Sequence, residues 1–377
     1  NGAGIYLYSS TNNTITNNTA ASLNTYGISL LFSTNNTITN NNASSNGDGI
    51  YLHSSTNNTI TNNNASSNAQ GVLLFCSSNN YIANNNVSSN FYGIELTNSN
   101  NNNLTNNTVN SQNSYGIFLT SSSYNIITNN TANSNTYGYG IFLESSTNNT
   151  VANNTASSNW DGIYLLGDSD NNTITNNIAN SNGWCGICLV SVISENIINN
   201  INNTTIINNT AENNTGWDFY SEYDAPDNNN TIVNLSIGSA NVSFTGVNIS
   251  LKGVSIPPGD PDGYRNISKY VNATNNSVGS WLFLNVSYND SDLNGIDERT
   301  LHISKYHNGT WETNCSAFAE NCGVDTENNI VYANITNFGS IFAPLSMSGA
   351  IPISNCTNIT SPGYYILTQD ITDSSAT

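Results

Sequence analysis

The sequence predicts an all-β protein in which a solenoid of stacked coils is followed by a β-sandwich. The main observation is an internal repeat. The phrase Gly-Ile-x-Leu, as in Gly4–Leu7 and Gly49–Leu52, alternates with Asn-Asn-Thr-Ile-Thr-Asn-Asn, as in residues 12–18. The glycine of the first phrase recurs every 22–24 residues between Gly4 and Gly186. A unit of this size cannot bury its apolar face alone, so successive units must stack.

Each repeat contains two short strands and a weak third one. Alternation places Ile5 and Leu7 on the inner face and Tyr6 on the outer face, which is the period of a strand. Gly, Asn and Ser mark the corners between strands. The third strand is expected around one later apolar residue of each repeat: Ala20, Ala43, Ala65, Val87, Val109, Ala132 or Ala156. We expect nine or ten coils over residues 1–233, with a longer insertion after Gly186, where the repeat loosens.

One asparagine of each repeat is expected to form an interior ladder, in which its side-chain amide donates to the equivalent residue one coil away. Such a ladder satisfies polar groups that are costly to bury alone. We assign it to the second-to-last Asn of the phrase, which gives Asn17, Asn40, Asn62, Asn84, Asn106, Asn129, Asn153 and Asn176.

This alternation of Gly-Ile-x-Leu with Asn-Asn-Thr-Ile-x-Asn-Asn resembles the right-handed parallel β-helix repeats of the NosD-like, pectate-lyase-like class found on archaeal surface proteins. The resemblance covers residues 1–233 and implies a right-handed parallel β-helix. It is a weak guide to function, because the class includes lyases, hydrolases, adhesins and structural layers. Copper, which the NosD name suggests, has little support, since His53, His302 and His307 are scattered and Met347 is the only methionine.

Residues 234–348 have a different texture, with alternating strands separated by turn signals, which indicates an Ig-like β-sandwich. The runs Gly263–Tyr270, Gly295–Glu298, Asn308–Trp311 and Ile335–Gly339 resemble a sandwich module of archaeal surface-layer and adhesin-like proteins. The strands are expected within residues 242–244, 247–251, 281–286, 301–306 and 330–335.

Residues 349–377 resemble the opening strand and cap that precede β-helices in the same surface proteins. Because this cap follows the sandwich, we interpret the chain either as part of a longer tandem protein or as a subunit that polymerises. In the second case the segment of one copy would cover the first coil of the next. The residues that would form this contact are Gly4, Ile5 and Leu7 on the first coil and Cys356, Tyr364, Tyr365, Ile366 and Leu367 on the segment.

The charge distribution argues against a nucleic-acid partner. The formal net charge is −19, and all five Lys and Arg residues lie after residue 251, whereas binding nucleic acid depends on cations that neutralise phosphates. No apolar run approaches the roughly 18 residues of a membrane span. The chain begins with Asn1, so we interpret it as a mature or partial chain without its export signal.

Asn-x-Ser/Thr sequons are frequent throughout the chain. Inside the repeat, Asn-Asn-Thr is either a structural requirement or a glycan site; outside it, the density of sequons favours N-linked glycans on an extracellular, cell-surface protein. The candidates are Asn12, Asn35, Asn57, Asn148, Asn171, Asn234, Asn241, Asn248, Asn266, Asn285, Asn308, Asn334 and Asn358.

Six cysteines favour an oxidising compartment. Cys315 and Cys322 are close in sequence and are expected to form a disulfide. Cys185 and Cys188 have the spacing of a redox or metal motif, but no second Cys-x-x-Cys exists. Zinc is therefore not expected there, and a local disulfide or outward surface thiols remain. Cys76 is expected to be a buried apolar filler.

An acidic segment begins like a calcium-binding loop, with oxygen donors at alternate positions and Gly295 at the sixth. The twelfth position is Leu301 rather than Glu. The segment is therefore either a calcium site or a plain acidic turn. Its donors would be Asp290, Asp292, Asn294 and Asp297.

We expect no enzymatic activity. A β-helix lyase of the resembling class would need a basic residue to abstract a proton, and residues 1–251 contain no Lys or Arg. Glu144 and Asp168 lie one coil apart, at a separation that a hydrolase could use, but nothing else forms a site around them.

Five aromatic residues occupy the outward x position of the Gly-Ile-x-Leu strand. They form either a packing stripe or a face that binds sugars or another subunit. They are Tyr6, Tyr51, Phe118, Phe142 and Tyr164.

The functional prediction that follows is a structural component of an extracellular archaeal surface assembly, either a filament or a surface layer. Its partners would be copies of itself or further domains of the same chain. The alternative is a non-catalytic adhesin or carbohydrate-binding protein that binds a surface polysaccharide.

Overall fold

The computed structural model of the protein describes residues 2–22, 24–110, 114–194, 197–222, 229–354, 358–359 and 364–368. By its internal contacts the chain separates into Asn1–Ile232 and Val233–Thr377. These are called here the first and second units. No helix in the described ranges has the length and apolarity needed to cross a membrane.

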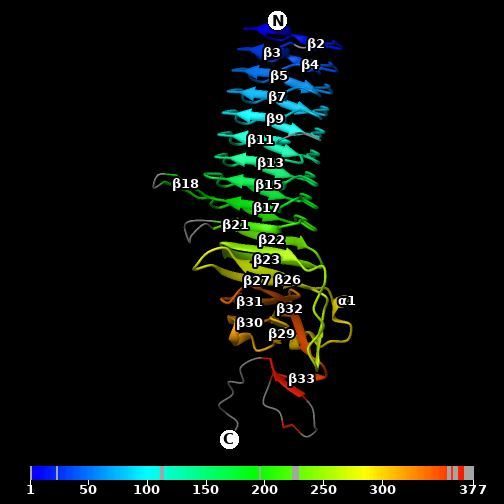
Figure 1. Ribbon diagram of the computed structural model, residues 1–377, viewed down its shortest axis with the longest axis vertical. Helices are drawn as coiled ribbons and strands as arrows, with labels where there is room; N and C mark the ends of the chain where they lie inside the picture. Colours follow the sequence, from blue (N-terminus) through cyan, green and yellow to red (C-terminus); the bar gives the residue numbers. More distant parts are fainter. Residues whose placement is uncertain are drawn as a thin grey trace. The chain divides into compact units, whose positions relative to one another are not determined.

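The first unit is a stack of coils, each with one long and one short strand (Figure 1). All pairing between coils in these two sheets is parallel; Ile28, for example, lies opposite Ile50. The long strands are β1 (Ala3–Tyr8), β3 (Tyr26–Leu31), β5 (Asp48–His53), β7 (Gln70–Phe75), β9 (Tyr92–Thr97), β11 (Ile117–Thr120), β13 (Tyr139–Glu144), β15 (Asp161–Leu166), β17 (Cys185–Val190) and β21 (Trp217–Glu222). The short strands are β2 (Thr14–Thr16), β4 (Thr37–Thr39), β6 (Thr59–Thr61), β8 (Tyr81–Ala83), β10 (Asn103–Thr105), β12 (Ile126–Thr128), β14 (Thr150–Ala152), β16 (Thr173–Thr175) and β20 (Thr205–Ile207). The predicted parallel β-helix is confirmed.

The apolar residues of both sheets point into the coils and form the core. Ile28 and Leu30 from a long strand and Ile38 from a short strand have no solvent exposure. The expected third strand is reduced to isolated bridges, such as Thr19 opposite Asn42, and the apolar residue that follows each bridge is buried.

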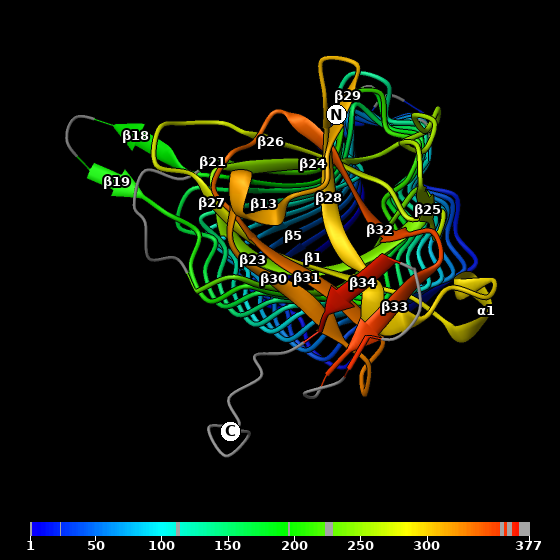
Figure 2. The ribbon, with the colours of Figure 1, turned by 90° about the horizontal axis from the view of Figure 1, so that it is seen from below.

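The insertion expected after Gly186 is an antiparallel hairpin of β18 (Val192–Ser194) and β19 (Ile197–Asn199). Viewed along the stack, the hairpin projects away from the coils (Figure 2). It lengthens the step between equivalent residues to 32, as between Asn177 and Asn209. The short-strand sheet continues with Ile206 in β20, not with Ile198.

Ladders of hydrogen-bonded polar side chains stabilise the corners of the coils. The predicted Asn ladder was wrong by one residue: the asparagine that follows each predicted one along the chain forms the ladder. The predicted residues are exposed and have φ near +55°, as at Asn84 and Asn106. That left-handed conformation turns the chain, so the next asparagine enters the interior. The observed ladder is Asn41, Asn63, Asn85, Asn107, Asn130, Asn154, Asn177 and Asn209, all buried.

Three further ladders lie at other corners of the coils. In each of them, hydrogen bonds connect equivalent residues of neighbouring coils. Two consist of asparagine and one of serine, and their members are buried. They include Asn36, Asn58 and Asn80, Asn135, Asn159 and Asn182, and Ser33, Ser55 and Ser77.

The second unit consists mainly of antiparallel strands in two groups. The first group is β22 (Thr231–Ile237), β23 (Ala240–Val247), β27 (Trp281–Ser287), β31 (Ile330–Ile335) and β30 (Ala319–Asp325). The second is β24 (Ile249–Gly253), β26 (Val271–Asn275), β32 (Ser340–Met347), β28 (His302–His307) and β29 (Thr310–Glu312), with β25 (Tyr264–Asn266) beside β32. Three single turns of helix are α1 (Asp290–Leu293), η1 (Glu298–Thr300) and η2 (Cys315–Ala317).

Alternation decides burial in these strands: Leu282 and Leu284 have no exposure, while Phe283 between them is half-buried. Each strand that was expected from the sequence of this region falls within or overlaps an observed strand: β23, β24, β27, β28 and β31. The Ig-like classification and the domain boundaries stay predictions.

Two last strands pair differently from the other strands of the second unit. β33 (Ala350–Ile353) and β34 (Tyr364–Leu367) are parallel, with Ala350 opposite Tyr364 and Ile353 opposite Leu367. Cys356 lies outside the described residues.

Candidate functional site

The outer face of the long-strand sheet is shaped by a close approach at the glycine of each Gly-Ile-x-Leu phrase. In the register between β15 and β17, Asp161 lies opposite Cys185, and the next paired residue is Ile163, which lies opposite Ile187. Gly162 lies between these two pairs. A Cβ atom on Gly162 would lie 2.5 Å from the carbonyl oxygen of Gly186 and 2.8 Å from Nδ2 of Asn182, so only glycine fits. The residue before the glycine and the x residue three positions later therefore lie side by side on the outer face. In a regular strand they would point to opposite faces.

Aromatic rings fill much of this outer face. Phe118 and Phe142 stack with ring centroids 4.8 Å apart, and Tyr139 and Tyr164 stack at 4.6 Å. Burial raises the pKa of Tyr139 to about 12. The faces of these rings pack against one another, so that mainly the ring edges are exposed to solvent. This geometry favours a packing stripe here over a sugar platform, which needs exposed ring faces.

The first coils carry a group of exposed aromatic side chains on the outer face. Tyr26 and Tyr51 stack at 4.7 Å, and an exposed aromatic ridge lies on β1 and at or just after the ends of β3 and β7. The ridge consists of Tyr6, Tyr8, Phe32 and Phe75, with exposed fractions of 55%, 59%, 49% and 36%.

A group of carboxylates interrupts the aromatic stripe. The Oε2 atom of Glu95 accepts a 2.8 Å hydrogen bond from Gln70, and burial raises the pKa of Glu95. Burial, and then the charge of Glu95, raises the pKa of Asp48 to about 6. The two carboxylates considered as a hydrolase pair are accessible to solvent: Glu144 is partly exposed and Asp168 is exposed.

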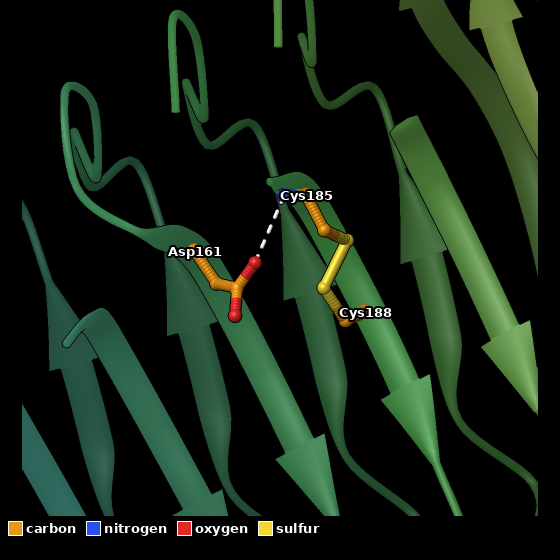
Figure 3. A group of neighbouring side chains, drawn as sticks. All are labelled: Asp161, Cys185 and Cys188. Atoms are coloured by element: carbon orange, nitrogen blue, oxygen red, sulfur yellow. Dashed lines mark hydrogen bonds between the residues drawn. A yellow bond between two sulfur atoms is a disulfide. The ribbon is translucent and has the colours of Figure 1, made fainter. Parts of the chain in front are cut away.

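A second group, near the end of the stack, combines a carboxylate with a disulfide (Figure 3). Cys185 and Cys188 on β17 are bonded to each other, and Asp161 on β15 faces them. Its Oδ1 atom accepts a 2.9 Å hydrogen bond from the backbone N–H of Cys185. All three residues are buried, and burial raises the pKa of Asp161 to about 7. Of the alternatives for these cysteines, the local disulfide is the one observed; Cys188 faces outward, but its neighbours cover it.

Sequence reasoning missed Asp161 as a partner of the cysteine pair. The signal was its spacing: Asp161 and Cys185 both immediately precede the glycine of their repeats. Residues that hold the same place in consecutive repeats are neighbours in the solenoid.

The other cysteines have different surroundings. Cys315 and Cys322 form a disulfide in the second unit. The expectation that Cys76 is a buried filler was wrong: its side chain is exposed. Cys76 directly follows β7 with φ +50°, so it lies on the corner of the coil rather than in its interior.

The acidic segment of the second unit directs its carboxylates to protein partners. Asp292 lies 3.2 Å from Lys269 Nζ and accepts from the backbone N–H of Asn289. Asp297 forms a 2.7 Å ion pair with Arg299. Asp290 accepts from Asn329. In the described part of the chain, the group with three metal-ligating side chains in mutual reach is Asp161, Cys185 and Cys188, so calcium binding at Asp290–Asp297 stays a prediction without geometric support.

Most candidate glycan sites have accessible side chains. Those of the repeat, such as Asn12 and Asn35, occupy exposed left-handed corners. Asn248 is the exception: it is 8% exposed and its Nδ2 donates a 2.7 Å hydrogen bond to Ser277. A glycan there would have to break this bond, so the geometry argues against Asn248. Occupancy at the other sites stays a prediction.

The predicted assembly residues that the structure describes lie in β1 and β34. Among the described strands β1 is the outermost of the long-strand sheet. Its Ile5 is partly exposed, whereas the equivalent Ile28 of β3 is fully buried. Leu367 of β34 is 57% exposed.

Two family descriptions match the first unit. "Right handed beta helix region" matches residues 1–109 and "Periplasmic copper-binding protein (NosD)" matches residues 76–218. No curated protein matches the chain.

Several solved structures are similar in fold. A variant of the periplasmic alginate epimerase AlgG has 19% identity and a TM-score of 0.48 over 54% of this chain and 50% of that one. The A-module of the mannuronan C-5 epimerase AlgE4 from Azotobacter vinelandii has 15% identity and a TM-score of 0.42, covering 61% and 74%. The Dettilon tailspike protein has 14% identity and a TM-score of 0.47, covering 91% and 86%. The chain thus spans half the length of AlgG. On the family matches, residues 1–109 are similar to right-handed β-helix regions and residues 76–218 are similar to NosD.

Proposed function

We propose that this chain is a structural component of an assembly on the outside of the cell, of the archaeal surface-layer or filament type that its sequence resembles. It acts without catalysis and carries N-linked glycans. Three features support export: the sequons, the two disulfides, and the periplasmic description of the NosD family.

The observation that carries this proposal is the strand edge that β1 presents among the described strands of the solenoid. Strand edges expose backbone N–H and C=O groups that can pair with another strand. At β1 this edge also leaves Ile5 partly exposed, although its equivalents in later coils are buried. A strand from a second copy, or from a preceding part of the same chain, would extend both the hydrogen bonding and the apolar core.

The strands β33 and β34 supply a suitable partner. They are consecutive along the chain and parallel, which is the pairing of the coils rather than that of the other strands of the second unit. Tyr365 and Ile366 are partly exposed and Leu367 is exposed. In this proposal the segment begins a new coil, onto which the β1 edge of the next copy docks.

We expect the Ile5→Lys variant to lose end-to-end polymers, because it places a charge in the core of the junction. Electron microscopy of the purified full chain, together with sedimentation over a range of concentrations, measures this. The matched control is Tyr6→Lys, on the same strand but pointing outward, which should still polymerise. Polymers of unchanged length in Ile5→Lys, or a wild-type chain that stays monomeric at all concentrations, would contradict the proposal.

A second candidate function, an adhesin that binds polysaccharide, is favoured by the aromatic ridge. Its rings are more exposed than the stacked rings of Phe118, Phe142, Tyr139 and Tyr164 in the later coils. Saturable binding of a neutral polysaccharide that is lost in the double variant Tyr8→Ala and Phe32→Ala, but kept in Phe118→Ala, would support this role.

A further inference from the structure

We infer that Asp161, Cys185 and Cys188 form a redox-gated site for a divalent zinc ion. The disulfide is the closed state of the site, and the reduced dithiolate is the state that binds metal. One carboxylate oxygen and the two sulfur atoms already lie within 4.8 Å of one another. A tetrahedral zinc site with bonds of about 2.3 Å to sulfur needs donors roughly 3.8 Å apart. Opening the S–S bond and turning the two cysteine side chains brings the donors into that range.

All three donor residues lie on strands, so the fold positions them relative to one another without a loop. The close approach at Gly186 puts Cys185 and Cys188 on the same face of β17, and the coil register puts Asp161 opposite Cys185. Zinc was not expected from the sequence, because the chain contains no second Cys-x-x-Cys. In the structure the preceding coil provides the third ligand, and three protein ligands are sufficient for zinc sites that keep one open position.

The local charge also favours a cation. Residues 1–251 contain no Lys or Arg, and Asp161 is only 2% exposed. An anionic carboxylate in such a place is costly unless a positive charge compensates it. When the cysteines are reduced, a bound Zn²⁺ ion offsets two of the three negative charges that the two thiolates and the Asp161 carboxylate bring together.

The switch requires an external two-electron reductant, for which a dithiol is sufficient. The dithiol donates two electrons and two protons: the Cys185–Cys188 bond breaks, both cysteines become thiols, and the dithiol closes to its own disulfide. Zinc binding then releases the two thiol protons to solvent. Re-oxidation by exchange with an external disulfide, which takes up the two electrons together with two protons from solvent and becomes a dithiol, ejects the ion and restores the disulfide observed here.

Cobalt titration of the full chain tests this inference. The protein is treated with a phosphine reductant under anaerobic conditions, and opening of the disulfide is checked by the mass increase after thiol alkylation. We expect the reduced protein to bind one Co²⁺ ion per chain with a thiolate charge-transfer band, and Zn²⁺ to displace it. The oxidised protein should show no band.

Variants identify the ligands. Asp161→Asn should weaken Co²⁺ binding at least about tenfold, and the double variant Cys185→Ser and Cys188→Ser should lose the band although it keeps Cys315 and Cys322. The matched control is Asp48→Asn, which also precedes the glycine of its repeat and should bind as the wild type does; circular dichroism checks the fold of each variant. A disulfide that resists reduction in the folded protein, an unchanged affinity in Asp161→Asn, or a band that persists without Cys185 and Cys188 would overturn the inference.

Discussion

Replacing Asn107 with leucine should lower the free energy of unfolding by about 3–6 kcal/mol, because it leaves several buried polar groups without partners at about 1–3 kcal/mol each. The Oδ1 atom of Asn107 accepts from both the backbone and the side chain of Asn85, each at 3.0 Å. Its Nδ2 donates to the carbonyl of Ile82 at 2.9 Å and to Asn130 at 3.0 Å. Leucine removes all of these bonds and cannot admit water in their place.

The neighbouring residue provides the control. Asn106 is exposed with φ +55°, so the change Asn106→Gly keeps a residue that tolerates the left-handed conformation and should cost less than about 1 kcal/mol. Urea unfolding followed by circular dichroism compares the two variants. Equal stability of Asn107→Leu and the wild type would show that the interior ladder does not stabilise the coils.

The oxidised, metal-free protein should lose as much as about 4 kcal/mol of stability between pH about 4 and about 8 through Asp161 alone. Burial raises the pKa of Asp161 from 3.8 to about 7 in the folded state, and a pKa that differs by one between the folded and unfolded states corresponds to about 1.4 kcal/mol. In this range the folded protein holds a proton that the unfolded chain has already released. Stability is therefore greatest below the unfolded pKa and declines as the pH rises through the folded pKa.

The variant Asp161→Asn should remove this decline and be more stable than the wild type at pH about 8, since its side-chain oxygen can still accept from the N–H of Cys185. Urea unfolding without reductant and with a chelator present measures both proteins across the pH range. Asp48→Asn is the comparison: its own pKa, raised to about 6, contributes a smaller decline, so this variant should remove only that smaller part and keep the part caused by Asp161. A wild-type stability that rises between these pH values, with Asp161→Asn following the same curve, would contradict the expectation.

The solenoid could be predicted from the sequence because its repeat is both regular and physically constrained. Ile at alternate strand positions must be buried, and a repeat of 22–24 residues is too small to bury it alone. The same reasoning located β23, β24, β27, β28 and β31 of the second unit but not its other strands. It failed at the corners: strand alternation does not continue through a residue with positive φ, so the ladder was assigned to Asn106 rather than Asn107, and exposed Cys76 was placed in the core.

The sequence by itself therefore determined the parallel β-helix, the inward apolar residues, the scarcity of cations and the presence of asparagine ladders. Only the tertiary structure decided which asparagines are buried, which aromatic rings stack on one another, and that Asp161 lies against the disulfide of the next coil. The physical reason is that the repeat specifies what each coil must bury, whereas contacts on the outer face depend on the register between coils and on how the chain turns at each left-handed corner. The glycine of the Gly-Ile-x-Leu phrase contributes both to the sequence repeat and to the tertiary contacts. It marks the period in the sequence, and its close approach to the neighbouring coil brings Cys185 and Cys188 to one face.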